Sequence, residues 1–256
     1  MAKPVGELVH GKSVLESGDS MQNDLVFLPA WNEDETVAKV VLEISLAYPG
    51  LDILVIDDGS SDLTRIKAKA AGAIVLRLPI NLGVGGAVKC AMRYGIENSY
   101  NNMFQIDADG QHDPKYITDL KTKLDAGTDL VIGTRFGSID HYPIGRIRIS
   151  IIKILSSIVK RIIRVEISDP TSGFRGFSRK AIEALYLDFP TEYLGDTIEC
   201  LLRAHHAGLS ISEIPVGMKE RQGGKPSAGP MRSFGYLMRA FFAIFVSEIR
   251  HMISKP

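Results

Sequence analysis

Two aspartates, Asp107 and Asp109, stand two positions apart directly after the apolar residues 103–106. If those residues form a strand, both carboxylates lie at its carboxyl end, where they can share a hard divalent cation. Mg²⁺ is usually bound by one or two carboxylates together with substrate phosphates, and Gln111 offers a third oxygen ligand. A D-x-D triplet alone is most often a solvated turn, so the metal hypothesis depends on the motifs that accompany it.

Two further polar motifs also come directly after apolar runs. Residues 29–33 (PAWNE) follow the run 25–28, and residues 57–62 (DDGSSD) follow the run 52–56. In an open parallel sheet, ligands bind outside the carboxyl ends of the strands. We therefore expect the three motifs to converge on one crevice, which favours a binding site over three unrelated turns.

The second of these motifs allows a structural and a functional interpretation. Ser60 or Ser61 is a suitable N-cap for the next helix, because a hydroxyl accepts hydrogen bonds from the unpaired N–H groups of a first turn. Two adjacent acids, Asp57 and Asp58, are harder to explain as a turn. One of them can accept a hydrogen bond from a nucleobase or a ribose.

A glycine-rich stretch at residues 81–87 (NLGVGGA) is similar to a dinucleotide-binding turn. It lacks the G-x-G-x-x-G spacing and follows the third apolar run rather than the first, so a nicotinamide site is disfavoured. We expect its glycines to serve a tight turn and close helix packing.

The elements that must position these motifs alternate between short apolar runs and stretches with helical spacing. Strands are expected at residues 25–28, 52–56, 73–78, 103–106, 130–133 and 209–216. Helices are expected at residues 33–48, 62–71, 83–98, 114–126, 145–165, 179–185 and 196–207, with a loop at 168–176. Repeated β-α units with fully apolar strands predict an α/β, Rossmann-like fold with a mainly parallel sheet flanked by helices. We expect a mobile tail at residues 1–23, one α/β domain at 24–230 and a C-terminal amphipathic helix at 231–256.

The overall composition excludes several classes of protein. The 256 residues include 30 basic and 30 acidic residues, whereas a general nucleic-acid binder needs a surplus of cations to neutralise phosphates. The two cysteines, Cys90 and Cys200, are too few for a disulfide scaffold or a thiolate zinc site, and we expect buried free thiols in a reducing cytosol. Residues 1–23 lack the apolar core of a signal peptide, and charges interrupt the long apolar regions 145–165 and 233–253, so no membrane-spanning helix is expected.

The neutral total conceals an uneven charge distribution. Residues 145–165 carry six basic residues and no acidic ones beside an apolar stripe at helical spacing. A basic, apolar helix of this kind is a candidate for binding the surface of an anionic membrane. The alternative is a helix that packs on the sheet and exposes a solvated outer face. The aromatic residues near the C-terminus allow the same two interpretations, binding to a membrane surface or packing on the sheet. Packing in a homodimer is a third.

Further motifs accompany the three at the strand ends: residues 133–136 (GTRF), 169–175 (DPTSGFR), 213–216 (EIPV) and 220–225 (ERQGGK). In this order the motifs resemble those of family 2 glycosyltransferases of the GT-A fold. Within that family they resemble the branch of dolichol-phosphate mannose synthases and polyprenyl-phosphate glycosyltransferases. The resemblance covers about residues 24–250, and the combination is highly specific although each motif alone is not.

The resemblance implies which residues bind a nucleotide sugar and a metal. The residues that would line the nucleotide pocket are Pro29, Trp31, Glu33, Ile56 and Asp58. Those that would hold the diphosphate and a Mg²⁺ or Mn²⁺ ion are Asp107, Ala108, Asp109 and Gln111, with the two aspartates and Gln111 as metal ligands. Many family members carry a tyrosine where Trp31 stands, and a stacking role survives that change.

Basic residues would complete the donor site. Arg135 and Arg221 would meet phosphate charge, for which the planar guanidinium is well suited. Many relatives place a lysine six residues after the equivalent of Arg221. Here that position is Ser227, and Lys225 comes four residues after Arg221. Lys225 can replace the missing lysine in the donor site only if its loop adapts.

The resemblance also implies the reaction, an inverting transfer of a sugar from a GDP- or UDP-linked donor such as GDP-mannose. The acceptor would be a polyprenyl or dolichyl phosphate at the cytoplasmic face of a membrane. Asp109 and Arg135 would act on the departing diphosphate, and a phosphate acceptor is already an anion that needs no base. In the alternative, the acceptor is a hydroxyl of a saccharide or small metabolite.

A hydroxyl acceptor would need a base, which would be Glu199 or Asp196, although Glu199 is equally well explained as a solvent-facing helix residue. A nucleotidyltransferase is a competing class that also uses an α/β sheet and paired acids. It usually carries a basic, glycine-rich loop near the first strand, and residues 29–33 contain no basic residue.

Overall fold

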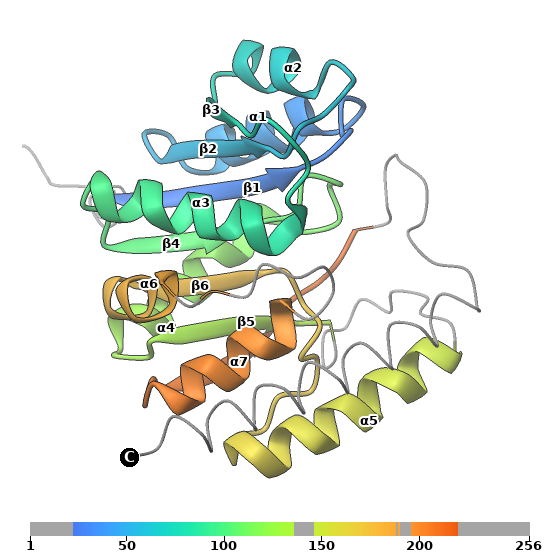
Figure 1. The fold of residues 1–256 in the computed structure, drawn as a ribbon, viewed down its shortest axis with the longest axis vertical. Helices are drawn as coiled ribbons and strands as arrows, with labels where there is room; N and C mark the ends of the chain where they lie inside the picture. The colour runs from blue at the N-terminus through green and yellow to red at the C-terminus, as the bar shows by residue number, and fades with distance from the viewer. Residues whose placement is uncertain (1–22, 136–145, 188, 190–195, 220–256) are drawn as a thin grey trace, which may run out of the picture.

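The computed structural model describes residues 23–135, 146–187, 189 and 196–219 (Figure 1). Within them one seven-stranded sheet has the order β3-β2-β1-β4-β6-β5-β7. The strands are β1 (Asp24–Ala30), β2 (Asp52–Asp57), β3 (Ile74–Arg77), β4 (Asn102–Gln105), β5 (Leu130–Thr134), β6 (Arg175–Ser178) and β7 (Ile211–Pro215). β6 is antiparallel to its neighbours β4 and β5, and the other pairs are parallel. The expected α/β fold with a mainly parallel sheet is confirmed.

Helices cover both faces of this sheet. They are α1 (Val37–Ala47), α2 (Thr64–Ala70), α3 (Gly83–Glu97), α4 (Ile117–Asp125), α5 (Arg146–Ile163), α6 (Arg179–Tyr186) and α7 (Asp196–His206), with a short 3-10 turn, η2 (Pro114–Tyr116), before α4. Apolar residues of α1, α2 and α4 pack on one face, and those of α3, α5, α6 and α7 on the other. Spacing explains this packing, because Val37, Val40, Val41 and Ile44 of α1 recur at helical intervals and are all buried.

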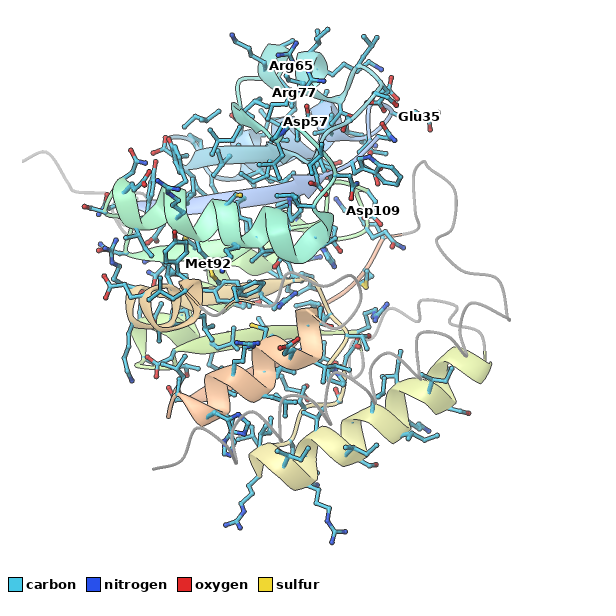
Figure 2. All side chains as sticks on the ribbon, viewed as in Figure 1. Glu35, Asp57, Arg65, Arg77, Met92 and Asp109 are labelled. Atoms are coloured by element: carbon cyan, nitrogen blue, oxygen red, sulfur yellow. The ribbon has the colours of Figure 1, made fainter. Side chains whose placement is uncertain are left out.

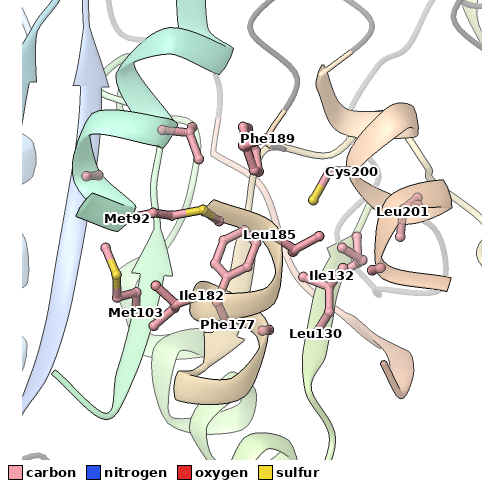
Figure 3. Packing of buried hydrophobic residues seen from close by; sticks show 14 of the residues in the cluster. Met92, Met103, Leu130, Ile132, Phe177, Ile182, Leu185, Phe189, Cys200 and Leu201 are labelled. Carbon is pink, nitrogen blue, oxygen red and sulfur yellow. The ribbon is translucent and has the colours of Figure 1, made fainter. Parts of the chain in front are cut away.

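Figure 3 shows the core between the sheet and the helices α3, α6 and α7. Met92 of α3 and Leu185 of α6 belong to one buried cluster with Met103 of β4 and Phe177 of β6. Cys200 of α7 is fully buried in the same cluster. This packing holds β4 and β6 in place from one face of the sheet, so the residues that follow β4 are attached to a rigid strand.

The strand β6 corrects the expectation of a loop at residues 168–176. Its sequence, RGFS, begins with a charged residue and a glycine, so no apolar pattern indicates a strand before Phe177. Arg175 is nevertheless only 1% exposed. A Cβ on Gly176 would stand 3.2 Å from Leu124 Cδ1, which explains the small residue at this position.

The direction of β6 matters for the site. Because β6 is antiparallel, its first residue, Arg175, lies beside Gln105 of β4 and Ile132 of β5, near the carboxyl ends of both strands. Residues 169–174 are thereby brought to the edge of the sheet where the polar motifs lie.

The basic helix expected at residues 145–165 is α5. Its inner stripe contains Ile152, Leu155, Val159 and Ile163, all at most 3% exposed. Lys153, Lys160 and Arg161 are exposed on the rest of the helix. In the described part of the chain, no helix is both long and apolar enough to cross a membrane. The helix expected at residues 231–256 and nearly all of the tail expected at 1–23 lie outside the described residues.

Candidate active site

The loops after β1 and β2 are joined by hydrogen bonds between side chains and main chain. The N–H of Asn32 donates to Ser60 Oγ over 3.0 Å, and Asn32 Oδ1 accepts from the N–H of Ser61 over 2.9 Å. The N–H of Glu33 donates to Thr64 Oγ1 over 2.8 Å. These hydrogen bonds connect the motif after β1 to the motif after β2. The carboxyl ends of the two strands therefore form one continuous polar edge.

The expectation that Ser60 or Ser61 caps the next helix is wrong. α2 begins only at Thr64, whose N–H donates to Asp62 Oδ1 over 2.9 Å. Ser60 accepts from Asn32 and donates its own N–H to Asp57 Oδ1 over 2.9 Å. The two serines come too early for the helix because their part of the loop turns toward the loop after β1.

Asp58 lies at the N-terminus of α3. Its Oδ1 accepts from the N–H of Leu82 over 2.7 Å, and its Oδ2 accepts from the N–H of Gly83 over 2.8 Å. Burial raises the pKa of this carboxyl, the two N–H donors lower it, and the charge of Asp57 raises it, with a net increase. The carboxylate occupies N–H groups with which a glycine-rich turn would bind a phosphate, which agrees with disfavouring a dinucleotide site.

The other residues expected in the nucleotide pocket lie in different environments. Trp31 is 52% exposed directly after β1, so its ring is accessible for stacking. The side chain of Ile56 is fully buried in the core, so only its main chain can face a nucleotide. Pro29 and Glu33 are partly exposed on either side of Trp31. Their contact with a nucleotide stays a prediction.

Asp107 and Asp109 follow the carboxyl end of β4, and Figure 2 shows Asp109 at the same edge of the sheet as Glu35. The side chain of Asp107 is 42% exposed. Asp109 and Gln111 are partly exposed, and Asp109 Oδ1 accepts from the N–H of Gln111 over 3.0 Å. Gly110 between them has a positive φ of 75°, a conformation that glycine adopts without strain. The structure therefore brings the three expected metal ligands together in one short loop.

The ligand set suits a cation that is shared with a substrate. Among the residues that the structure describes, no group of three or more His, Cys, Asp or Glu could hold a metal ion. Two carboxylates and an amide oxygen are hard ligands, and they leave coordination positions open for phosphate oxygens. The loop fits Mg²⁺ or Mn²⁺ bound together with a diphosphate better than it fits a metal held by protein alone.

Two residues near this loop were not expected from the sequence. The N–H of Asp107 donates to His112 Nδ1 over 3.2 Å, and the His112 ring lies 5.2 Å from the ring of Phe174. Burial lowers the pKa of His112 to about 4, so the imidazole is neutral at pH 7 although Asp107 Oδ2 lies 3.9 Å from Nδ1. The sequence signal was the histidine that directly follows Gln111 at the end of the same motif.

Arg135 comes directly after β5 and is fixed by an ion pair. Its Nε lies 2.6 Å from Asp169 Oδ2, and its Nη2 donates to Thr171 Oγ1 over 3.2 Å. The side chain of Arg135 is 9% exposed, and that of Asp169 is fully buried. Asp169 belongs to the same segment as Gly173 and Phe174, which lie beside Asp107 and His112. Arg135 is therefore near the loop of paired aspartates, with a partner that the sequence had not indicated.

The segment after β7 is also attached to this loop. The N–H of Lys219 donates to the Gln111 carbonyl over 2.8 Å, and Lys219 Nζ lies 2.9 Å from Glu43 Oε2 of α1. Arg221 and Lys225 lie outside the described residues.

Glu199 is not the solvent-facing residue that the sequence allowed. It lies in α7, is 8% exposed, and its Oε1 accepts from Nε and Nη2 of Arg203 over 3.0 and 2.5 Å. Asp196 begins the same helix. The structure therefore pairs Glu199 with a cation on its own helix, and its role as a base stays a prediction.

Comparison with known proteins assigns the chain to a family. The model of the family described as "Glycosyl transferase family 2" matches residues 25–186. This range contains the three strand-end motifs, Arg135 and β6. The chain belongs to the family 2 glycosyltransferases, which removes the nucleotidyltransferase alternative.

Several curated relatives are named for transfer to lipid phosphates. Polyprenol monophosphomannose synthase of Mycolicibacterium smegmatis is 30% identical over 211 residues, which cover 78% of this chain and 79% of that protein. Undecaprenyl-phosphate mannosyltransferase of Micrococcus luteus is 30% identical over 78% of this chain and 85% of that protein. Dolichol-phosphate mannosyltransferase of Pyrococcus furiosus is 28% identical over 84% of this chain and 62% of that protein.

A solved structure supports the fold. Glucosyl-3-phosphoglycerate synthase from Mycobacterium tuberculosis, crystallised with Mn²⁺, UDP and glucosyl-3-phosphoglycerate, matches with a TM-score of 0.71. The two chains are 24% identical, and the match covers 95% of this chain and 88% of that chain. At this identity the likeness establishes the GT-A fold and leaves the substrates of the present protein to other arguments.

Proposed function

We propose that this family 2 glycosyltransferase moves a hexose from a nucleotide sugar to a polyprenyl phosphate. The observation that carries the proposal is the pair Asp107 and Asp109, set in one loop at the carboxyl end of β4 beside the fixed guanidinium of Arg135. Relatives that are 30% identical are named for polyprenol monophosphomannose and undecaprenyl-phosphate mannose synthesis, which supports a lipid phosphate as acceptor. Their names also favour mannose, and so GDP-mannose as donor.

The nucleoside would bind over the joined ends of β1 and β2. Trp31 would stack on the base, since its ring is half-exposed and next to the strand end. Pro29, Glu33 and the main chain of Ile56 would line the pocket. Asp58 would contact the nucleotide through its carboxylate. Alternatively, it would hold the pocket in shape, because it accepts hydrogen bonds from two N–H groups at the N-terminus of α3.

The diphosphate would be held by Asp107, Asp109 and Gln111 through Mg²⁺ or Mn²⁺. When bound, such a cation stabilises the negative charge that builds up on a departing phosphate. Mn²⁺ with UDP in a neighbour of the same fold supports this type of site. Ala108 is 2% exposed, so it would keep the loop anchored to the core while the two aspartates face outward.

Arginine and lysine side chains of the protein would also stabilise the negative charge of the diphosphate. Asp169 and Thr171 orient the Arg135 guanidinium before any substrate arrives, and a preorganised charge is more effective than one that must be ordered during the reaction. Arg221 and Lys225 would approach the same phosphates from the segment after β7. The reaction itself would be an inverting displacement at the anomeric carbon.

A phosphate acceptor accounts for the state of Glu199. The acceptor is an anion at neutral pH, so no side chain has to remove a proton from it. The carboxylate of Glu199 is paired with Arg203, an arrangement that favours a structural role. If a hydroxyl were the true acceptor, Glu199 would be the first base to test, followed by Asp196.

The outer face of α5 would bring the enzyme to its lipid. Lys153, Lys160 and Arg161 are exposed there, and Ile154 between them is 46% exposed. Figure 2 shows long side chains of α5 that end in nitrogen and point away from the sheet. Cations around an exposed apolar side chain suit the surface of an anionic membrane, and we propose peripheral binding at its cytoplasmic face.

A panel of radiolabelled GDP- and UDP-sugars, each with a short polyprenyl phosphate, tests the proposed function. We expect one nucleotide sugar to label the lipid when Mg²⁺ or Mn²⁺ is present and EDTA to abolish the labelling. Asp109→Ala serves as the inactive control. Absence of labelled lipid across the panel, with transfer to a water-soluble hydroxyl acceptor instead, would contradict the proposal.

A further inference from the structure

Residues 172–174 lie against the loop that carries the paired aspartates. A Cβ on Gly173 would stand 2.8 Å from Asp107 Oδ1 and 2.9 Å from Asp107 Oδ2, closer than side chains normally approach. Because Gly173 has no Cβ, it leaves the space next to it that the Asp107 carboxylate occupies. A larger residue at position 173 would displace this carboxylate or the segment itself.

The ring of Phe174 supports the other end of the same loop. Its centroid lies 5.2 Å from that of the His112 imidazole, with 37° between the two planes. A Cβ on Gly133 of β5 would collide with Phe174 Cδ1, and the N–H of Gly133 donates to the Phe174 carbonyl over 2.8 Å. Gly133 therefore leaves the space that Phe174 fills, and Phe174 in turn packs on His112.

His112 closes the loop with a hydrogen bond to its first residue. The chain leaves the sheet after Ile106, whose N–H still donates to the Phe27 carbonyl of β1 over 3.1 Å. The next N–H, that of Asp107, donates to His112 Nδ1 over 3.2 Å. The main chain of His112 also forms an antiparallel bridge with Met218, so the imidazole is tied to structure outside the loop.

We propose that His112 and Gly173 are positioning residues for the metal site. His112 Nδ1 holds the peptide N–H of Asp107, and Gly173, which has no Cβ, leaves the space that the Asp107 carboxylate needs in its present direction. The inference rests on the proposed function, because it concerns the carboxylate that would bind the cation. Neither residue is assigned as a metal ligand, and each would act through Asp107: His112 by holding its main chain, and Gly173 by leaving room for its carboxylate. Loss of such an outer partner typically weakens metal binding roughly 10- to 100-fold.

Two substitutions of His112 separate the hydrogen bond from the packing. His112→Phe keeps a ring against Phe174 and removes the acceptor, whereas His112→Asn keeps an acceptor close to the Nδ1 position and removes the ring. We expect Mn²⁺ affinity, measured by EPR with GDP or UDP present, to fall about tenfold in His112→Phe. The affinity of His112→Asn should stay within about threefold of the wild type, and thermal unfolding should show the opposite order of the two variants. Wild-type Mn²⁺ affinity in His112→Phe would overturn the role of His112.

Gly173→Ala tests the second contact, with Gly176→Ala as its matched control. The new methyl at position 173 would push on the Asp107 oxygens, whereas the methyl at position 176 would meet Leu124 Cδ1 at 3.2 Å. We expect Gly173→Ala to weaken Mn²⁺ binding about tenfold, to raise the Mn²⁺ concentration needed for half-maximal transfer equally, and to recover most of kcat at saturating Mn²⁺. Equal Mn²⁺ affinity in the two alanine variants would overturn the role of Gly173.

The wild-type protein distinguishes failure of this inference from failure of the proposed function. Wild type that binds no Mn²⁺ and transfers sugar in EDTA overturns the metal part of the proposed function and this inference with it. Wild type that binds Mn²⁺, with His112→Phe and Gly173→Ala binding it equally well, overturns the positioning roles and leaves the proposed function intact.

Discussion

Two carboxylates after the carboxyl end of β4 carry the proposed chemistry at the scale of single residues. Asp107→Asn and Asp109→Asn each keep the shape of the side chain and remove one charge from the candidate metal site. We expect kcat/KM for sugar transfer to fall about 100-fold or more, because a bound cation contributes several kcal/mol to the stabilisation of phosphate charge. Thermal unfolding of each variant should match that of the wild type. Transfer at the wild-type rate by either variant in the presence of EDTA would contradict the metal assignment.

Arg135 is the second residue whose chemistry can be tested alone. Arg135→Lys keeps a positive charge but cannot contact both Asp169 and Thr171 with a planar group. We expect kcat to fall about 100-fold, which is typical when one preorganised donor to a developing negative charge is lost. Steady-state kinetics with saturating nucleotide sugar measures this effect.

A matched control for Arg135→Lys is Arg93→Lys. Arg93 lies on the outer surface of α3, where its Nε lies 2.8 Å from Glu97 Oε1 and 66% of its side chain is exposed. Exposed pairs of this kind contribute little, so neither kcat nor thermal stability should change measurably. A loss of activity in both lysine variants would mean that the assay reports general damage rather than the role of Arg135.

At the scale of secondary-structure elements, the sequence predicts the β-α units well and misses β6. Apolar runs identify β1, β2 and β4, and the polar residues that follow them identify the strand-end motifs, so Asp107 and Asp109 could be placed in advance. β6 is short and starts with Arg-Gly, and its antiparallel direction depends on pairing with strands more than 40 residues away in the sequence. No local pattern encodes such a pairing.

The failure to predict β6 also explains which residues of the candidate site were not predicted. Gly173 and Phe174 directly precede the antiparallel strand β6, whose pairing brings them to the loop of paired aspartates, where Phe174 packs on His112. For Asp58, in contrast, the sequence indicated the residue but not its hydrogen-bond partners. Its type and position are compatible with a nucleotide ligand, but the N–H groups of Leu82 and Gly83, which approach it from a later helix, could not be foreseen from the motif.

The ends of β5 and β7 opposite the site offer a test of element packing. Asp129 Oδ2 accepts from the N–H and Oγ of Ser210, both over 2.9 Å, and lies 3.0 Å from Lys180 Nζ. Burial raises the pKa of Asp129, but these donors together outweigh it and lower the pKa below its ordinary value of 3.8. The folded protein therefore binds fewer protons at this site than the unfolded chain in acid. The stabilisation is fully present above pH 3.8 and is lost as the pH falls through the lower folded value.

Asp129→Asn should reveal this contribution. We expect the free energy of unfolding at pH 7 to fall by about 1 kcal/mol, because the N–H and hydroxyl of Ser210 lose a charged acceptor and Lys180 loses its counterion. The difference from wild type should begin to shrink as the pH falls through 3.8, because the unfolded wild-type chain then binds a proton that the folded carboxyl does not yet bind. Urea unfolding at pH 7, 5 and 3.5 measures this trend. A difference that does not vary with pH would show that the charge of Asp129 is not the cause.

At the scale of the whole molecule, the residues proposed to bind the donor and those proposed to bind the membrane lie on different elements. The strand-end loops carry the acidic and aromatic residues, whereas α5 carries an exposed basic face. Replacing Lys153, Lys160 and Arg161 by glutamine should lower binding to anionic vesicles about tenfold or more, since each cation near such a surface contributes roughly 1 kcal/mol. Vesicle sedimentation at low and high salt measures it, and nucleotide-sugar affinity should be unchanged.

The control for this variant removes the same charge from the opposite face of the sheet. Arg65, Lys69 and Lys123 are exposed on α2 and α4, which pack on the other side from α5. Glutamine at these three positions should leave vesicle binding nearly as in the wild type. Equal losses in the two triple variants would indicate that net charge, rather than the face of α5, directs the protein to the membrane.

The most direct test of the proposed function compares two lipids that differ only in their head group. A short polyprenyl phosphate and the matching polyprenol are each incubated with the accepted nucleotide sugar, Mg²⁺ and the full-length protein, and initial rates of lipid labelling are measured. A phosphate oxygen is already ionised at neutral pH, and Glu199 is engaged by Arg203, so we expect transfer to the phosphate and none above background to the alcohol. Faster labelling of the polyprenol, or of a water-soluble sugar added as a third acceptor, would contradict the assignment of a lipid phosphate as the acceptor.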